Sequence, residues 1–204
     1  MRKYKSIPGA FNYSYEDAFT MEDIATRHLY LNQEIDESVV NNIVYHIIRF
    51  NRIDKGIRPE ERDPIWLYIN SPGGALTDGF GLVDAITTSV TPVYTINLAL
   101  AGSAAFFVFL AGKKRFAMPR SEFLLHEGYM GDVSSISKVH DNVQFMASDI
   151  VPMIKEYVIS RTSIDERLYE SRYRMEWYML AQEAKTLGVV DSIIGEDCTI
   201  EDAL

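Results

Sequence analysis

The chain has 204 residues, of which 47% are hydrophobic and 24% are charged, and its formal net charge is -9. This length and mixture predict one globular domain, expected over residues 21–204 behind an N-terminal arm of residues 1–20. The acidic balance argues against nucleic acid or an anionic membrane as a partner. The single cysteine, Cys198, excludes a disulfide within the chain and favours a cytoplasmic location. We see no signal peptide and no membrane span.

Up to residue 88 the sequence alternates between strand and helix patterns. A short strand at His28–Leu31 is followed by a helix over 36–51, whose apolar residues recur on one stripe. The charged stretch 52–63 is expected to be a surface loop. A buried strand then runs over Ile65–Ile69, and Leu76–Thr88 forms the next helix.

The same alternation continues through the middle of the chain. A second buried strand is expected at Val93–Asn97, and the apolar run Ala104–Ala111 forms a buried helix. Two further strands follow at Lys114–Met118 and Glu122–Leu125.

The last third of the chain is mainly helical. A long helix runs over Ile136–Ile159, and a short helix over Ala181–Leu187 ends at Gly188, before an extended piece that begins at Val189. Alternating strands and helices predict an α/β fold with a parallel sheet.

Two glycines follow the strand that begins at Ile65. They belong to the run Asn70-Ser71-Pro72-Gly73-Gly74. Without side chains, such residues let backbone N–H groups turn toward a ligand and form an anion cradle. Taken alone, a Gly-Gly pair is more often a simple turn between a strand and a helix.

Ser103 and His126 are candidates for a nucleophile and a general base. Ser103 follows Gly102 where a loop is expected to enter a helix, so the N–H of Ala104 faces the positive end of that helix. His126 closes a strand and can lie beside Ser103 at the sheet edge. Alone, Ser103 is more often a helix N-cap and His126 a structural histidine. With the glycines, they supply the three parts of acyl transfer at a serine.

The order and spacing of these motifs resemble the proteolytic subunit of the Clp protease. The likeness covers roughly residues 24–196 and includes a second block, Ala181-Gln182-Glu183-Ala184 followed by Gly188-Val189-Val190-Asp191. It implies the ClpP/crotonase-like fold of stacked ββα units, with the helix Ile136–Ile159 as a protruding handle. It also implies a serine endopeptidase that needs neither cofactor nor metal, and the four histidines of the chain lack metal-ligand spacing.

The resemblance assigns catalytic roles residue by residue. Ser103 matches the family nucleophile and His126 the general base, while Gly74 and Ala104 match the two backbone donors of the oxyanion hole. Counting back from Ala181-Gln182-Glu183-Ala184 places Glu176 where the family has an aspartate. The family arginine just before that acid is Met175 here.

Binding sites for substrate and partners are also implied by the resemblance. The residues expected to contact substrate peptide are Gly73 and, on an extended segment from Glu127 to Val133, Glu127, Gly128 and Tyr129. The residues expected to dock a hexameric AAA+ unfoldase, in a pocket between subunits, are Trp66, Tyr68, Thr88 and Ile194. Thr88 replaces a large apolar residue. The resemblance implies heptameric rings, stacked in pairs, that cleave peptides and, with the unfoldase, unfolded proteins.

Two other functions stay open from the sequence. One is a catalytically weak Clp-like subunit of a mixed ring, which Glu176, Met175 and Thr88 favour and which Ser103 with His126 opposes. The other is a crotonase-type acyl-CoA enzyme, which shares the fold and an oxyanion hole. The Asn-Ser-Pro-Gly-Gly run and the serine–histidine pair argue against it.

Overall fold

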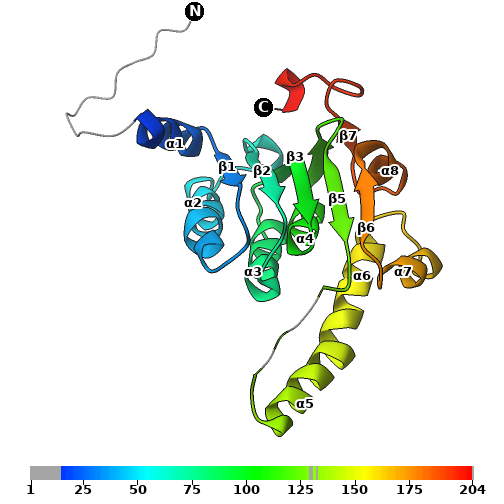
Figure 1. Ribbon diagram of the computed structural model, residues 1–204. Helices are drawn as coiled ribbons and strands as arrows, with labels where there is room; N and C mark the ends of the chain where they lie inside the picture. Colours follow the sequence, from blue (N-terminus) through cyan, green and yellow to red (C-terminus); the bar gives the residue numbers. More distant parts are fainter. Residues whose placement is uncertain (1–14, 129–130, 132, 204) are drawn as a thin grey trace, which may run out of the picture.

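A seven-stranded sheet forms the centre of the protein, and most of its strands are parallel. The computed structural model describes residues 15–128, 131 and 133–203. Five strands lie in the order β1-β2-β3-β4-β7, while β5 pairs with β3 and carries β6 on its other side. Among the described strands, only β5 and β6 pair antiparallel. The predicted α/β class with a parallel sheet is therefore confirmed (Figure 1).

The strands are short except for two in the middle of the sheet. Their bounds are His28–Leu31 for β1, Ile65–Ser71 for β2, Val93–Gly102 for β3, Lys114–Ala117 for β4, Glu122–Leu125 for β5, Trp177–Leu180 for β6 and Ser192–Ile193 for β7. Five match predicted strands in place. β3 is longer than expected, β6 was not predicted, and β7 begins three residues after the extended piece predicted from Val189.

The helices are α1 (Tyr15–Ala25), α2 (Tyr45–Ile53), α3 (Leu76–Thr87), α4 (Ala104–Leu110), α5 (Ile136–Phe145), α6 (Val151–Arg161), α7 (Glu166–Arg172) and α8 (Ala181–Thr186). Short 3₁₀ turns lie at Pro59–Glu61 and at Glu201–Ala203, and the latter is called η4. Helices α1 and α7 were not predicted. Helix α1 overlaps the part of the expected arm that the structure describes, and residues 1–14 lie outside that description.

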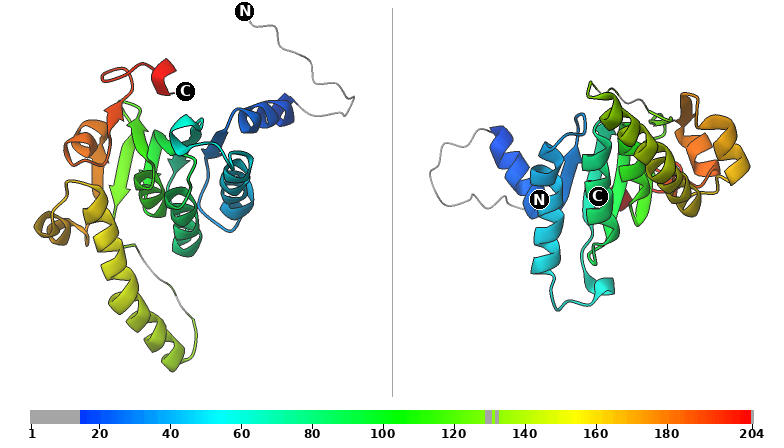
Figure 2. Two further views of the ribbon diagram at one scale, coloured as in Figure 1. Left: turned by 180° about the vertical axis from the view of Figure 1, so that it is seen from behind. Right: turned by 90° about the horizontal axis from the view of Figure 1, so that it is seen from below.

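Side-chain alternation divides the sheet into two faces. On β2, Ile65, Leu67 and Ile69 belong to the main core beneath helices α2, α3 and α4, which lie together in Figures 1 and 2. The residues between them, Trp66 and Tyr68, belong to a second cluster on the opposite face. Successive side chains of a strand point to opposite faces, so one strand serves both clusters.

Helix α4 lies at the centre of the main core. All seven of its residues are buried. Gly79 on α3 lets the two helices approach closely, because a Cβ there would come within 3.1 Å of the Ala104 side chain. This packing fixes the start of α4, directly after Ser103.

The predicted long helix is present but not uniform. Helices α5 and α6 form one rod with a π-helical turn between them at Met146–Ile150. Pro152 follows that turn and has no N–H to donate to the preceding turn, so a wider local register accommodates it. The rod projects away from the sheet as a handle, and none of the residues of α5 is buried (Figure 1). No helix in residues 15–128 or 133–203 is long and apolar enough to cross a membrane.

Candidate active site

The predicted nucleophile, Ser103, lies in a tight turn between strand β3 and helix α4. The sequence predicted a loop before Ser103, but β3 continues to Gly102 and α4 begins at Ala104. The turn forces Ser103 to φ 52° and ψ -124°, a conformation that L side chains rarely adopt. Its N–H donates to the Leu124 carbonyl at 2.9 Å. The strained turn leaves the residue half-buried at the end of β3 and ties it to β5.

Gly73 packs directly against this turn. A Cβ on Gly73 would lie 2.6 Å from the Ser103 Cβ and 2.6 Å from the Gly102 carbonyl oxygen, so no other residue fits. Its φ of 100° also favours glycine. The predicted glycine pair is therefore a close-approach site, and more than a plain turn.

The two predicted backbone donors lie in segments next to the Ser103 turn. Gly74 forms an isolated bridge with Ile35 that uses the Gly73 carbonyl and the Ala75 N–H, which leaves the Gly74 N–H outside it. The N–H of Ala104 opens helix α4, where the first N–H groups have no partner within the helix. Both predicted oxyanion donors thus belong to segments that contact the Ser103 turn.

His126 and Glu176 face each other across the antiparallel strands β5 and β6. The last register pair, Leu125 with Trp177, places the next residues of the two strands opposite each other. The Nδ1 atom of His126 lies 2.8 Å from Oε1 of Glu176. Side chains opposite one another on antiparallel strands have Cβ atoms about 5 Å apart, a gap that a glutamate spans.

The second ring nitrogen of His126 has a different environment. Nε2 is buried and has no hydrogen-bond partner among the described residues. The histidine side chain is 13% exposed, whereas that of Glu176 is 59% exposed. In this structure the hydrogen bond between His126 Nδ1 and Glu176 is formed, whereas the one between His126 Nε2 and the Ser103 hydroxyl is not. Such bonds are often long before substrate arrives.

Helix α7, which precedes the acid in the chain, is held against α6. Lys155 on α6 contacts Glu166 and Glu170 of α7 at 2.7 and 2.6 Å, and the Asp165 carboxylate caps the helix by accepting from Leu168 N–H. These two carboxylates raise the pKa of Lys155. Glu170, which lies six residues before Glu176 in the sequence, is therefore already paired with Lys155.

The other predicted contacts lie in three places. Glu127 and Gly128 are exposed directly after His126, and β5 ends before them. Tyr129 lies outside the described residues. Trp66, Tyr68 and Ile194 gather in the second hydrophobic cluster, at the opposite end of β3 from Ser103. Thr88 ends α3, where its hydroxyl donates to the Asp84 carbonyl at 2.6 Å, and belongs to neither cluster.

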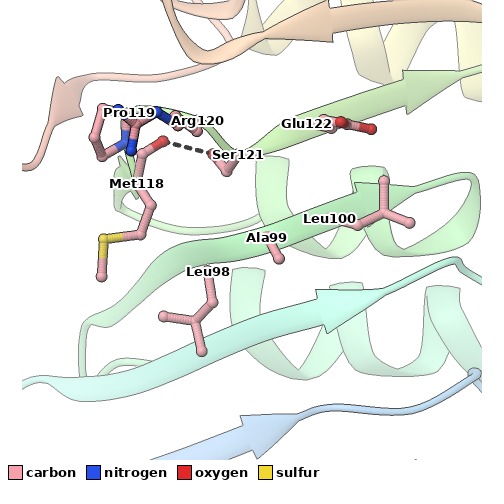
Figure 3. Close-up of a pocket in the computed structure, with 8 residues that line it drawn as sticks. All are labelled: Leu98, Ala99, Leu100, Met118, Pro119, Arg120, Ser121 and Glu122. Atoms are coloured by element: carbon pink, nitrogen blue, oxygen red, sulfur yellow. Dashed lines mark hydrogen bonds between the residues drawn. The ribbon is translucent and has the colours of Figure 1, made fainter.

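A pocket of about 520 Å³ opens where β3 changes partners from β4 to β5 (Figure 3). It is lined by Leu98–Leu100 of β3 and by residues 118–122, a turn that the Ser121 hydroxyl closes by donating to the Met118 carbonyl. None of the predicted site residues lines it. In the part of the chain that the structure describes, no group of His, Cys, Asp or Glu could hold a metal.

Sequence reasoning missed the elements that carry the acid. β6 and α7 were not predicted, so only the family spacing located Glu176. The aromatic and apolar run Trp177–Leu180, whose burial alternates, is the signal that indicates β6. The positive φ of Ser103 has no signal in composition or periodicity.

Known proteins match this chain over most of its length. The family model described as Clp protease matches residues 15–197. The proteins named ATP-dependent Clp protease proteolytic subunit 2 in Treponema denticola and in Prochlorococcus marinus strain MIT 9312 are 29% and 28% identical, and cover 87% and 92% of this chain and 86% and 90% of their own lengths. ATP-dependent Clp protease proteolytic subunit of Physcomitrium patens is 28% identical over 94% of both chains. The serine turn, the histidine–carboxylate pair and this match agree, and the chain belongs to the Clp protease family as a Clp-type serine peptidase.

Proposed function

We propose that this Clp-type peptidase cleaves peptide bonds with Ser103 as nucleophile, His126 as general base and Glu176 as the residue that orients the base. The observation that carries the proposal is the 2.8 Å contact between His126 Nδ1 and Glu176 Oε1, on strands next to the strained Ser103 turn. This contact fixes the proton on Nδ1, which leaves Nε2 as the basic atom.

The reaction then follows from these positions. The Ser103 hydroxyl oxygen attacks the peptide carbonyl carbon while its proton moves to His126 Nε2. The N–H groups of Gly74 and Ala104 hold the oxyanion that forms. The C–N bond breaks as the leaving amine takes the proton from Nε2. Water then attacks the acyl-serine with the same histidine as base, and the acid product and the free serine result.

Substrate peptide lies along Gly73 and along Glu127, Gly128 and Tyr129 in this proposal. The exposure of Glu127 and Gly128 directly after the histidine supports it, because a peptide there reaches Ser103 from the open end of the sheet. The chain forms heptameric rings stacked in pairs around a chamber, and it works in the cytoplasm. The exposed handle supports assembly, since Ile136, Val143 and Phe145 are unusually exposed apolar residues for a free surface.

A hexameric AAA+ unfoldase docks on the aromatic cluster in this proposal. Trp66, Tyr68 and Ile194 supply the apolar contacts, and Thr88 of a neighbouring subunit supplies a weaker one. The names of the curated relatives, which describe an ATP-dependent protease, support a partner of this kind.

The test compares wild type with Ser103→Ala on a short fluorogenic peptide, with native mass spectrometry for the assembly. We expect turnover to fall by several orders of magnitude in the variant while the oligomer is retained. Turnover equal to wild type in the alanine variant would refute the assignment of Ser103.

A catalytically weak subunit of a mixed ring is the second candidate. The absence of a hydrogen-bond partner for His126 Nε2 among the described residues, and the exposed Met175 before the acid, favour this candidate. Reaction with a serine-directed phosphonate separates the two, because only an activated serine is labelled. The family match disfavours the acyl-CoA enzyme, for which a test of CoA binding is sufficient.

A further inference from the structure

The C-terminal turn of this chain folds onto the aromatic cluster. Ala203 is 1% exposed and packs with Trp66, Tyr68, Ile96, Phe116 and Ile194 in one contact cluster. In Figure 1, η4 lies beside the end of the sheet at which β2 and β3 begin. The surface that we propose as the docking site is thus partly covered by the chain itself.

This covering segment is held mainly by its own short-range bonds. The Asp202 carboxylate accepts from the N–H and the hydroxyl of Thr199, at 2.8 and 2.7 Å, and the Ala203 N–H donates to the Ile200 carbonyl at 3.2 Å. Within the described part of the chain, every hydrogen bond of residues 199–203 closes inside this segment. A turn whose hydrogen bonds are internal, and which has one small apolar side chain in the cluster, can be displaced without breaking a hydrogen bond to the rest of the described chain.

The cluster beneath the turn is incompletely packed and, within the described chain, has an unpaired polar group. The Tyr68 hydroxyl is buried there without a hydrogen-bond partner among the described residues, and this burial raises its pKa to about 12. Tyr68 also stacks on the exposed ring of Tyr30, with ring centroids 5.0 Å apart. An alanine methyl covers little of such an aromatic surface, so a longer apolar side chain fits the site better.

We propose that residues 199–203 act as a built-in competitor for the aromatic cluster, which an apolar loop of a protein partner must displace. This inference rests on the proposed function of the cluster. Only molecules in which the turn is displaced bind a partner. The apparent dissociation constant for the partner is therefore the intrinsic one divided by the fraction of molecules with a displaced turn. The partner loop must carry an aliphatic or aromatic anchor in place of Ala203.

The experiment uses a matched pair of full-length variants. Ala203→Asp puts a charge at a buried position and should expel the turn, whereas Ile200→Asp adds the same charge at a side chain that is 52% exposed. Both are made with Trp177→Phe, which leaves Trp66 as the only tryptophan of the two in the chain. Acrylamide quenching of Trp66 then reports whether the cluster is uncovered, without reference to any partner.

Binding is measured with a fluorescein-labelled, capped peptide that has a central Leu-Phe pair. We expect Ala203→Asp to increase Trp66 quenching and to lower the peptide Kd at least threefold relative to Ile200→Asp. Truncation after Cys198 should behave like Ala203→Asp, which guards against a folding defect of one variant. Unchanged quenching in both altered forms, or increased quenching with an unchanged Kd or no peptide binding, would overturn the competitor role.

Hydrolysis of a short peptide by the same C-terminal variants, made without Trp177→Phe, separates this inference from the proposed function. Ser103 follows the last residue of β3 and the cluster includes Tyr94 near its first, a span of about 30 Å for ten residues. Turnover should therefore be the same in all forms. Absence of turnover in wild type would argue against the peptidase assignment and leave the quenching result intact.

Discussion

Replacement of Glu176 by glutamine tests the most unusual feature of the site. The change keeps the size of the side chain and removes its charge. Glutamine can donate its amide N–H to Nδ1 of His126, at the position where Glu176 Oε1 now lies 2.8 Å away. The proton of the neutral ring then moves to Nε2, and the base that Ser103 needs is lost.

The exposure of the carboxylate sets the size of the effect. A hydrogen bond to a charged group contributes about 1.5–3 kcal/mol, and each 1.4 kcal/mol is a factor of ten in rate. Because the Glu176 side chain is 59% exposed, water weakens its hold on the imidazolium. We therefore expect kcat/KM to fall toward the lower end of that range, about 10- to 50-fold, less than the roughly 10⁴-fold typical of a buried triad aspartate.

The assay measures kcat/KM for a short fluorogenic peptide between pH 6 and 9. Glu170→Gln is the matched control, because Glu170 contacts Lys155 and makes no bond to His126. It should keep wild-type activity. Full activity of Glu176→Gln across this range would refute the reasoning and identify a serine–histidine dyad. An inactive wild type that gains activity with Glu176→Asp would instead support the weak-subunit alternative.

Three further predictions follow from the glycines, the strained serine and a buried ion pair. Gly73→Ala should abolish peptide turnover because its Cβ would lie 2.6 Å from that of Ser103, whereas Gly81→Ala, where nothing lies within 4 Å of the added carbon, should keep it. Ser103→Gly should raise Tm although it removes activity, since the φ of 52° costs serine about 1–3 kcal/mol, and an equal or lower Tm would contradict this strain. Asp54→Asn should lower the free energy of unfolding in urea by about 3 kcal/mol at pH 7, because Arg27 loses a partner that is 1% exposed. Arg27 lowers the pKa of Asp54, so this contribution is complete above about pH 4 and is lost as the pH falls further. If the free energy of unfolding of Asp54→Asn fell with decreasing pH as steeply as that of wild type, this explanation would be wrong.

The sequence predicted the parts of the fold that have strong periodicity. The strands at β2 and β4 and the helices α3 and α4 lie within one or two residues of their expected bounds. The long helix was also expected, but its π-helical turn depends on how Pro152 is accommodated, which a stripe of apolar residues does not indicate. Short elements such as α7 are stabilised by tertiary contacts, here those of Lys155, and carry little signal of their own.

The candidate site was predictable in its residues but not in its geometry. The family motifs named Ser103, His126 and Glu176, and the structure brings the last two into contact. Why glutamate can stand in this position depends on the register of β5 with β6, a pairing between segments some fifty residues apart in sequence. Long-range register of this kind is set by packing, and no local pattern reports it.

Strand β3 pairs first with β4 and then with β5, and this change places the nucleophile and the acid–base pair on different parts of the sheet. Ser103 directly follows β3, while His126 and Glu176 adjoin the β5–β6 ribbon, which pairs with β3 from Leu100 to Gly102. A small rotation of that ribbon would carry base and acid together and change their distance from the nucleophile, against the restraint of the bond from Ser103 N–H to the Leu124 carbonyl. Such a motion would control activity through the distance between Ser103 and His126, while the contact between His126 and Glu176 stays unchanged.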